Sequence, residues 1–498
     1  MRYALGLDNG GTMIKAAVYD ETGCEIACAS CPTETINPVS GFVERDMQVM
    51  WEANCSCIRR VLEKSNIPAE QIIAVSVAGH GKGLYLWGEG KPLCNAILSS
   101  DNRAWSYPEK WKADGTWDAL YPKLRQPLLA GQPVALLAWL KEHEASTYQS
   151  IQWVFSAKDY IRFRLSGKAC SEITDISGSG MMDIENGCVN ADLLKALGIE
   201  EIYSRIPPLC GSCDICGSIS AETAALTGLQ EGTPVAGGMF DIDACAIAMN
   251  ITSPDYICSI SGTWSINELL SKQPVTSSTS VLHSRYAIPE YYLIEESSAT
   301  GAGNADWILE HLIHLPSDDS RYETANQMVS EILPEHCDVY YLPFLYGSSG
   351  HPLGKACFAG MTSYHDERHM LRAVYEGVVF CAKDHMEHLL QLRPAVKAVR
   401  LGGGAAKSAV WIQLFADILN QPIETVSGVK ELGAFGCAMA GFVAAGVYRD
   451  YEEAAAAMVK LNDAVYPDPH RVEIYEKKYE KYSALRKAMD TVWPLFTV

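Results

Sequence analysis

Apolar residues recur along this chain with two spacings, one typical of β-strands and one typical of α-helices. Near the N-terminus, the apolar runs Tyr3–Leu7 and Ile14–Tyr19 flank the turn Gly10-Gly11-Thr12, which predicts a β-hairpin. An amphipathic helix is predicted from about Asp46 to Ser65, because apolar residues recur there at helical spacing. A further strand, Ile72–Val77, follows it. This alternation predicts an α/β fold.

Helices dominate the prediction for the rest of the first half. They are expected at Trp105–Ala113, Pro133–Tyr148, Lys158–Leu165 and Ser220–Thr227. The stretch from Ser166 to Cys216 is rich in Gly, Ser, Cys and Pro. It is therefore interpreted as loops around one short helix near Ala191–Leu197.

The second half repeats the plan of the first. Tyr256–Ile260, the turn Ser261-Gly262-Thr263 and Trp264–Leu269 form a second strand–turn–strand pattern. A chain of 498 residues exceeds the size at which one hydrophobic core keeps growing, so two domains are expected, residues 1–250 and 251–498. Later helices are expected at His369–Leu392, Ser408–Leu419, Glu431–Ala445 and Asp463–Trp493.

A carboxylate stands at a break in the middle of the chain. The apolar run after Thr233 ends in Gly237-Gly238, Asp241 follows, and a small apolar helix continues to Asn250. Active-site groups are often mounted where a strand passes into a helix, so Asp241 is a candidate general base. The alternative is a simple helix N-cap. Asp243 is the competing carboxylate.

The charge balance excludes some classes of partner. The formal net charge is −20, whereas nucleic acid or an anionic membrane surface would require a basic face. The start of the chain lacks a signal-peptide pattern, and the longest small apolar run, from Gly433 to Tyr448, is shorter than the ~20 residues of a membrane span. A cytoplasmic location, with no membrane partner, is expected.

Seventeen cysteines raise the question of a metal site. Cys210, Cys213 and Cys216 follow the spacing C-x2-C-x2-C, but no fourth ligand is evident nearby. Reduced, mostly buried thiols are expected.

Three Gly-rich strand ends are candidate phosphate cradles: Asp8–Thr12, Ser261–Thr263 and Gly402–Gly404. Glycine lets backbone N–H groups approach phosphate oxygens, and Thr adds a hydroxyl donor. None of the three is a Walker A or Rossmann motif, and a tight turn is the alternative for each. Asp8 ends an apolar strand, where a divalent cation would compensate its buried charge. Lys15, on the returning strand, would neutralise a phosphate.

From these motifs the chain resembles the FGGY family of carbohydrate kinases essentially from end to end. The hairpin D-x-G-G-T…K is similar to the first phosphate motif of the family, and Ala356–Glu376 fits its second signature throughout. Gly131–His143 fits the first signature, except that Leu136 stands where Lys is usual. LGGGAAKSAVWIQLFADILNQPI resembles the adenosine segment. The resemblance implies two domains of RNase H/actin-like (ASKHA) fold, with ATP and sugar in the cleft between them.

The resemblance also implies roles for individual residues. Asp241 matches the catalytic base, and Asp8 and Asp241 are the carboxylates expected near Mg²⁺. The first domain is expected to bind the sugar and the second to bind ATP. The positions that match ATP and phosphate contacts are Gly10, Gly11, Thr12, Lys15, Gly262, Thr263, Gly403, Gly404 and Ser408.

The loop Ala78–Gly83 aligns with the substrate loop of the family. Glycerol kinases usually place Arg-Glu there and D-xylulokinases Met-His, whereas this chain has Gly81-Lys82, preceded by His80. His80, Gly81 and Lys82 are the candidate sugar contacts, with a solvated loop as the alternative. Asp101 is expected to pair with Arg103 rather than with sugar.

The segments GKGLYL, NAILSSD and PVALLAWLKEHE are most similar to those of bacterial L-xylulose kinases. The predicted reaction is therefore ATP- and Mg²⁺-dependent phosphorylation of L-xylulose at its terminal hydroxyl, giving L-xylulose 5-phosphate. The alternatives are another pentulose or polyol (D-xylulose, ribulose, erythritol), or an actin-like nucleotide-dependent sensor without sugar chemistry. A homodimer is expected from symmetry statistics alone.

Overall fold

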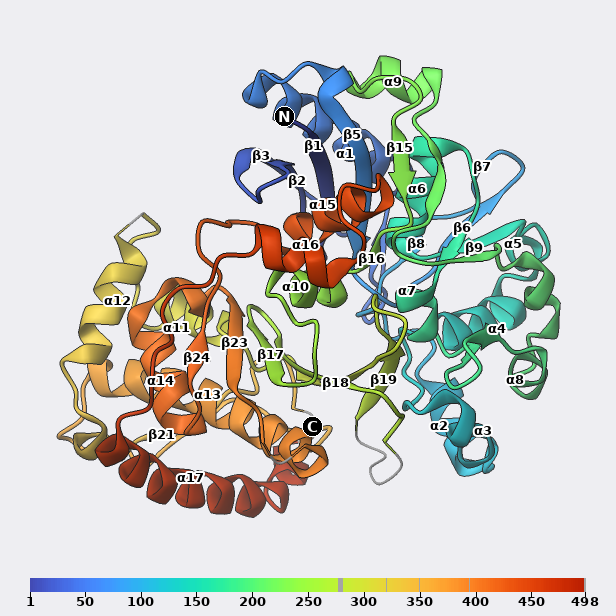
Figure 1. Ribbon diagram of the computed structural model, residues 1–498. Coiled ribbons are helices and arrows are strands. Elements are labelled where there is room, and N and C mark those ends of the chain that lie inside the picture. The colour runs from blue at the N-terminus through green and yellow to red at the C-terminus, as the bar shows by residue number, and fades with distance from the viewer. Residues whose placement is uncertain (276–280, 319, 349, 394, 497–498) are drawn as a thin grey trace. The chain divides into compact units, whose positions relative to one another are not determined.

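The computed structural model describes residues 1–275, 281–318, 320–348, 350–393 and 395–496. They form two compact units, each assembled from separate stretches of the chain (Figure 1). The first unit comprises Met1–Thr252, Leu270–Ile294 and Gly428–Lys460. The second unit comprises Ser253–Leu269, Glu295–Ser427 and Leu461–Val498.

A seven-stranded sheet forms the centre of the first unit. Its order is β14-β15-β5-β1-β2-β3, and β16 also pairs with β5. The strands β1, β2 and β3 are antiparallel neighbours, whereas β1, β15 and β16 run parallel to β5. The predicted N-terminal hairpin is thus confirmed. The strands are β1 (Tyr3–Asn9), β2 (Met13–Asp20), β3 (Glu25–Pro32), β5 (Ile72–Gly79), β14 (Ile215–Ser218), β15 (Pro234–Ala236) and β16 (Met239–Phe240).

Helices cover this sheet. The predicted amphipathic helix is α1 (Met47–Ser65), which begins where the Asp46 carboxylate accepts hydrogen bonds from Gln48 N and Val49 N. Its buried face packs with α6 (Ala157–Ser166) in a core that contains Trp51, Ile58, Val75 and Tyr160.

The helix α15 (Leu432–Ala444) packs directly on β1 and β5 and on α10 (Asp241–Ala248). Glycine makes this approach close enough, since a Cβ at Gly6 would lie 1.8 Å from Ala434 O, and one at Gly436 would lie 2.0 Å from Ala244 O. The Ala- and Gly-rich run is therefore a buried packing helix. No helix in the described part of the chain combines the length and apolarity that a bilayer crossing requires.

Two predictions for the middle of the first unit are wrong in detail. The single helix expected at Pro133–Tyr148 is two, α4 (Pro133–His143) and α5 (Ala145–Gln149), because Glu144 leaves helical geometry at φ −136° and ψ 55°. The stretch expected to hold one short helix holds α8 (Ala191–Ala196) and also α7 (Ile173–Ser177). Five residues are too short to show a helical period in the sequence.

The remaining elements of the first unit are mostly short. Its helices include α2 (Ser106–Ala113), α3 (Thr116–Leu124), α9 (Ala221–Thr227), α16 (Tyr451–Met458), and the 3₁₀ helices Ala69–Gln71 and Glu200–Arg205. Its further strands are β4 (Glu44–Arg45), β6 (Tyr85–Gly88), β7 (Lys91–Pro92), β8 (Ala96–Ile97), β9 (Trp153–Phe155), β10 (Ser171–Glu172), β11 (Met182–Asp183), β12 (Cys188–Val189) and β13 (Leu209–Cys210).

A second sheet repeats the motif of the first, and its strands β17, β23 and β24 lie in the second unit. The sheet order is β19-β20-β18-β17-β23-β24, in which β17 and β18 form an antiparallel hairpin and β23 runs parallel to β17. This copies the relation of β1, β2 and β5, so the α/β prediction and the repeated plan are confirmed. The strands are β17 (Tyr256–Ser261), β18 (Ser265–Ser271), β19 (Leu282–Arg285), β20 (Tyr292–Ser298), β21 (Tyr340–Leu342), β22 (Cys357–Ala359), β23 (Ala398–Gly403) and β24 (Ile423–Glu424).

Long helices surround the second sheet. The helix α13 (Glu367–Leu392) starts in a capping box formed by Asp366 and His369. The last α-helix, α17 (Pro469–Asp490), starts later than predicted, because Asp468 caps it and Pro469 takes its first position. The others are α11 (Gly303–His311), α12 (Arg321–Ser330), α14 (Ala409–Leu419), and the 3₁₀ helices Pro334–His336, Ala405–Lys407 and Trp493–Phe496.

Candidate active site

The carboxyl ends of three parallel strands meet at one edge of the first sheet. In the pairing register, Asp8 of β1 and Met239 of β16 both lie beside Ala78 of β5. Asp241 follows β16 directly, and the loop after Gly79 follows β5. The sheet therefore brings the first phosphate turn, the candidate sugar loop and the candidate base to the same edge, which is where α/β sheets place ligands.

Asp241 is the first residue of α10, and Phe240 holds the cap position without a side-chain hydrogen bond. Asp241 is therefore not the N-cap of this helix. Its side chain is partly exposed, whereas Asp243 is fully buried and its Oδ1 accepts a hydrogen bond from Ala287 N at 3.1 Å. Asp243 thus has a packing role in the first turn, and Asp241 is the carboxylate presented at the edge.

Asp8 lies under the start of α15, where a Cβ at Gly433 would come within 2.6 Å of its Oδ2. Burial raises the pKa of the Asp8 carboxyl to about 6, with Lys15 opposing the shift and Glu431 adding to it. Its Oδ1 is buried without a hydrogen-bond partner among the described residues. An unsatisfied carboxylate oxygen is a ligand that Mg²⁺ prefers, so the residue fits the proposed metal.

Lys15 forms an ion pair with Glu431, Nζ to Oε2 at 2.6 Å. Although burial disfavours the charged form, Glu431 and Asp8 raise the pKa of Lys15, which keeps the ammonium charged. Gly11 and Thr12 are exposed at the turn, beside Gly10. The phosphate contacts of Gly10, Gly11, Thr12 and Lys15 stay predictions, and a phosphate would compete with Glu431 for Lys15.

The sequence reasoning missed Arg45. Its guanidinium is buried, and its Nη2 donates to Gly11 O behind the phosphate turn. Its Nη1 has no hydrogen-bond partner in the described part of the chain, and burial lowers the pKa of this group. No local sequence signal marks it, because the contact joins residues far apart in the chain.

In the candidate sugar loop, His80 is buried and its Nε2 lies 2.8 Å from Tyr85 Oη. Burial lowers the pKa of His80 to about 4, so the ring is neutral at physiological pH. Gly81 lies against Phe240, where a Cβ would come within 2.5 Å of the ring. Lys82 has a left-handed backbone at φ 62° and lines a small cavity with Asp175.

Arg103 pairs with Asp101 at 2.9 Å and with Glu44 at 2.6 Å, which confirms the expected ion pair. The guanidinium also lies over the Phe42 ring, 4.0 Å from its centroid. Asp101 thus stabilises the loop after β8.

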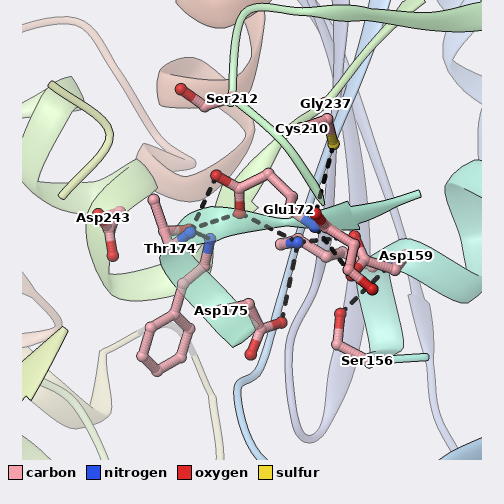
Figure 2. Close-up of polar contacts among 12 residues, drawn as sticks. Ser156, Asp159, Glu172, Thr174, Asp175, Cys210, Ser212, Gly237 and Asp243 are labelled. Atoms are coloured by element: carbon pink, nitrogen blue, oxygen red, sulfur yellow. Dashed lines mark hydrogen bonds and ion pairs between the residues drawn. The ribbon is translucent and has the colours of Figure 1, made fainter. Parts of the chain in front are cut away.

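A cluster of buried charges, which we call the buried charge cluster, comprises Lys158, Asp159, Arg162, Glu172 and Asp175. Figure 2 shows its three carboxylates. Lys158 Nζ lies 2.8 Å from Asp159 Oδ1 and 3.2 Å from Glu172 Oε2. Burial disfavours the ammonium, but the three carboxylates raise the pKa of Lys158 overall. Burial raises the pKa of Asp175 to about 7. The sequence analysis did not single out these residues.

In the second unit, two of the candidate cradles are neighbours. Ser261 pairs with Gly403 in the register of β17 and β23, and a Cβ at Gly403 would lie 2.5 Å from Ser261 O. Gly403 adopts φ 81°, a conformation that favours glycine. Gly262 and Thr263 form the adjoining turn of the hairpin.

A cavity of about 280 Å³ lies beside these turns and is lined by Gly404, Ser408, Tyr375 and Trp411 among others. The Tyr375 and Trp411 rings stack, with centroids 4.0 Å apart. Ser408 caps α14 and its Oγ donates to Asn326 Oδ1 at 2.9 Å. An aromatic wall with a few polar groups suits a planar base, in agreement with the adenosine segment predicted there.

The cysteine grouping expected from the sequence is corrected. The Sγ atoms of Cys170, Cys210 and Cys216 lie within 4.8 Å of one another, whereas Cys213 does not belong to this group. Cys213 lies instead beside Tyr451. Structural zinc takes four ligands, and the described residues offer no fourth Cys, His or carboxylate to this group.

Family models match both halves of the chain. The FGGY family of carbohydrate kinases, N-terminal domain, matches residues 3–248, and the C-terminal domain of the same family matches residues 258–445. The chain belongs to the FGGY family of carbohydrate kinases. It is therefore a phosphotransferase that uses ATP, and the actin-like sensor alternative is set aside.

Curated FGGY relatives align over nearly the whole chain. The L-xylulose/3-keto-L-gulonate kinase of Escherichia coli (strain K12) is 38% identical over 494 residues, covering 98% of this chain and 97% of that protein. The probable L-xylulose kinase of Pasteurella multocida (strain Pm70) is 34% identical, covering 98% and 99%. The xylulose kinase of Bacillus subtilis (strain 168) is 26% identical, covering 97% and 96%.

Solved FGGY structures share the fold. The ligand-bound xylulose kinase from Lactobacillus acidophilus superposes with a TM-score of 0.91 at 24% identity and covers 100% of both chains. The gluconate kinase from the same organism gives 0.90 at 24% identity, again over 100% of both chains. The predicted actin-like fold class is thereby confirmed.

Proposed function

We propose that this kinase transfers the γ-phosphate of ATP to the terminal hydroxyl of L-xylulose, giving L-xylulose 5-phosphate. The observation that carries the proposal is the shared sheet edge, where Asp8, the loop His80–Lys82 and Asp241 come together. The loop departs from the glycerol and D-xylulose patterns, and the relatives at 38% and 34% identity carry L-xylulose in their names.

In the proposed mechanism, Asp241 accepts the proton of the sugar hydroxyl as that oxygen attacks the γ-phosphate in line. Asp8, whose Oδ1 has no hydrogen-bond partner in the described part of the chain, would hold Mg²⁺ with Asp241 as the second carboxylate. The bound ion would neutralise charge on the phosphates. Lys15 would release Glu431 and contact a phosphate, and the uncharged turn at Gly262 and Thr263 would supply backbone and hydroxyl donors.

We assign the sugar and the base to the first unit and ATP to the second unit, with the adenine in the cavity beside Gly403, Gly404 and Ser408. His80, Gly81 and Lys82 are the proposed sugar contacts. The neutral His80 ring offers one donor and one acceptor to hydroxyls. A cytoplasmic location, where ATP is available, and a homodimer belong to the same proposal.

Lys82 favours a second candidate substrate. Lys82 lines the cavity next to the sugar loop, and a cationic side chain there suits the carboxylate of a keto-sugar acid such as 3-keto-L-gulonate. Lys82→Met is expected to lower kcat/KM for the acid more than for L-xylulose. Equal losses on both would remove the carboxylate contact from the proposal.

The test is an ADP-release assay across L-xylulose, D-xylulose, ribulose, erythritol and 3-keto-L-gulonate. The highest kcat/KM is expected on L-xylulose, and a clear preference for another sugar would overturn the substrate assignment.

The role of Asp241 needs a separate experiment. Asp241→Asn should keep ATP affinity, measured by calorimetry, and lose phosphoryl transfer by about 10²- to 10⁴-fold. Normal turnover by this variant would show that Asp241 is not the base.

A further inference from the structure

The buried charge cluster carries a large desolvation cost. Its five side chains are at most 4% exposed. Removing charges from water is costly, and replacing a buried ion pair by apolar residues of similar volume is often neutral or stabilising. Such a cluster is therefore weak evidence for stability, and the hydrogen bonds that leave it show which backbone segments it holds in place.

Hydrogen bonds from the cluster and from the adjoining Thr174 hold Gly237 and Phe240, the two ends of the short segment that precedes Asp241. Arg162 Nη1 donates to Gly237 O at 2.5 Å, at the Gly-Gly break. Phe240 N donates to Thr174 Oγ1 at 2.8 Å, at the residue immediately before Asp241. Figure 2 shows Gly237 and Thr174 on the two sides of the cluster.

The Thr174 hydroxyl has a fixed orientation. Its Oγ1 donates to Glu172 Oε2 at 2.7 Å, and Thr174 N donates to Glu172 Oε1 at 3.1 Å. Lys158 in turn holds Glu172 at 3.2 Å. Because the hydroxyl proton is committed to Glu172, the Thr174 oxygen presents a lone pair to Phe240 N.

Phe240 is the residue whose backbone sets the direction of Asp241. It holds the cap position of α10 in an extended conformation, φ −56° and ψ 144°, and Asp241 is the next residue. A cap N–H lies outside the helical hydrogen bonds, and here the Thr174 hydroxyl accepts it. We propose that Thr174, aligned by Glu172, is a positioning residue for the carboxylate of Asp241. This inference rests on the proposed role of Asp241 as the base.

The test compares Thr174→Val, which keeps the shape and removes the hydroxyl, with Thr174→Ser, which keeps the hydroxyl. In an ADP-release assay with L-xylulose, Thr174→Val should lower kcat by about 10- to 100-fold, since a misplaced catalytic group costs about that much. KM for ATP should stay within about twofold, because the nucleotide cavity is in the other unit. Thr174→Ser should restore kcat to within about threefold of the parent.

Thr227 provides a matched control in the same unit. It is fully buried, its Oγ1 donates to Thr223 O at 2.7 Å, and it accepts from Leu229 N at 3.3 Å. Thr227→Val therefore removes a hydroxyl of the same kind at α9, outside the site. It should lower the melting temperature about as much as Thr174→Val and leave kcat unchanged.

The outcomes separate the positioning role from the role of the base. Unchanged kcat in Thr174→Val, or an equal loss in Thr174→Ser, would overturn the positioning role. If Asp241→Asn, measured alongside, turns over normally, the proposed base itself fails. An inactive Asp241→Asn with a fully active Thr174→Val would leave the base in place and remove only Thr174.

Discussion

Each unit of this kinase contains a buried network of charges, and the two networks differ in what they hold. In the second unit, Arg372 Nε lies 2.8 Å from Glu376 Oε1, and Lys478 pairs with the same carboxylate. Tyr475 also donates to Glu376. The pairs with Glu376 join α13 to α17, and Arg372 and Lys478 also donate to the backbone carbonyls of Ile332 and Pro334, which holds the segment after α12.

The buried charge cluster of the first unit has similar chemistry and similar burial. In this cluster, however, Arg162 donates to Gly237 O as well as to Cys170 O, and Glu172 holds Thr174, whose hydroxyl accepts from Phe240 N just before Asp241. Asp175 also lines the cavity beside Lys82. Burial alone therefore does not distinguish a functional network from a structural one. The backbone groups that each network contacts do.

The largest difference is expected from removing one carboxylate in each network. Glu172→Gln and Glu376→Gln should each lower the free energy of unfolding by about 3–5 kcal/mol, because each leaves a buried cation undercompensated. Only Glu172→Gln should also lower kcat, since an amide offers one acceptor oxygen where Glu172 uses two for Thr174. Urea unfolding and kcat, measured well below the melting temperature, check this. Equal kcat losses would remove the distinction.

A milder change tests the hydrogen bond from Arg162 to Gly237 O, at the other end of the segment before Asp241. Arg162→Lys and Arg372→Lys keep the charge and lose the forked geometry, so each should cost about 1–3 kcal/mol of stability. Arg162→Lys should lower kcat as well, because Arg162 holds Gly237 O. Arg372→Lys should leave kcat at the parent value. Thermal unfolding and the ADP-release assay give both numbers, and a kcat loss in Arg372→Lys would contradict the structural role of its network.

The sequence allowed the local pattern to be predicted. The hairpins around Gly10-Gly11-Thr12 and Gly262-Thr263, and the helices after Asp46 and Ser408, are all formed. Each is governed by residues close together in the chain: apolar alternation, a turn, or a capping side chain. The local pattern left a helix N-cap open for Asp241 and a tight turn open at Asp8–Thr12, and the family signatures favoured the catalytic roles over these alternatives.

What could not be predicted depends on contacts between distant segments. Arg45 meets Gly11, and Thr174 meets Phe240, across 34 and 66 positions. Cys170 replaces Cys213 in the thiol group because strand pairing of β10 with β13 brings it there. These contacts depend on how distant segments of the chain come together in the fold, which the local pattern of the sequence does not specify.

The mildest perturbation is a change of pH, which tests Asp175 within the cluster. The folded carboxyl, with its pKa raised to about 7 by burial, keeps its proton at a pH where the unfolded carboxyl, at 3.8, has lost it. The folded state therefore binds more protons between about pH 4 and 7, so stability falls as pH rises through this window, by at most about 1.4 kcal/mol per pH unit. Asp175→Asn has no titrating carboxyl at this position. The free energy of unfolding of the parent minus that of the variant should therefore fall from pH 5 to pH 7. Glu172, whose pKa burial also raises, is present in both proteins, and its charge helps to raise the pKa of Asp175, so the measured difference includes this coupling. The lowered pKa of Asp159, which burial opposes and Lys158 and Arg162 bring about, acts only at lower pH. Urea unfolding at half-unit pH steps measures the difference, and a value independent of pH would show that Asp175 stays ionised in the folded protein.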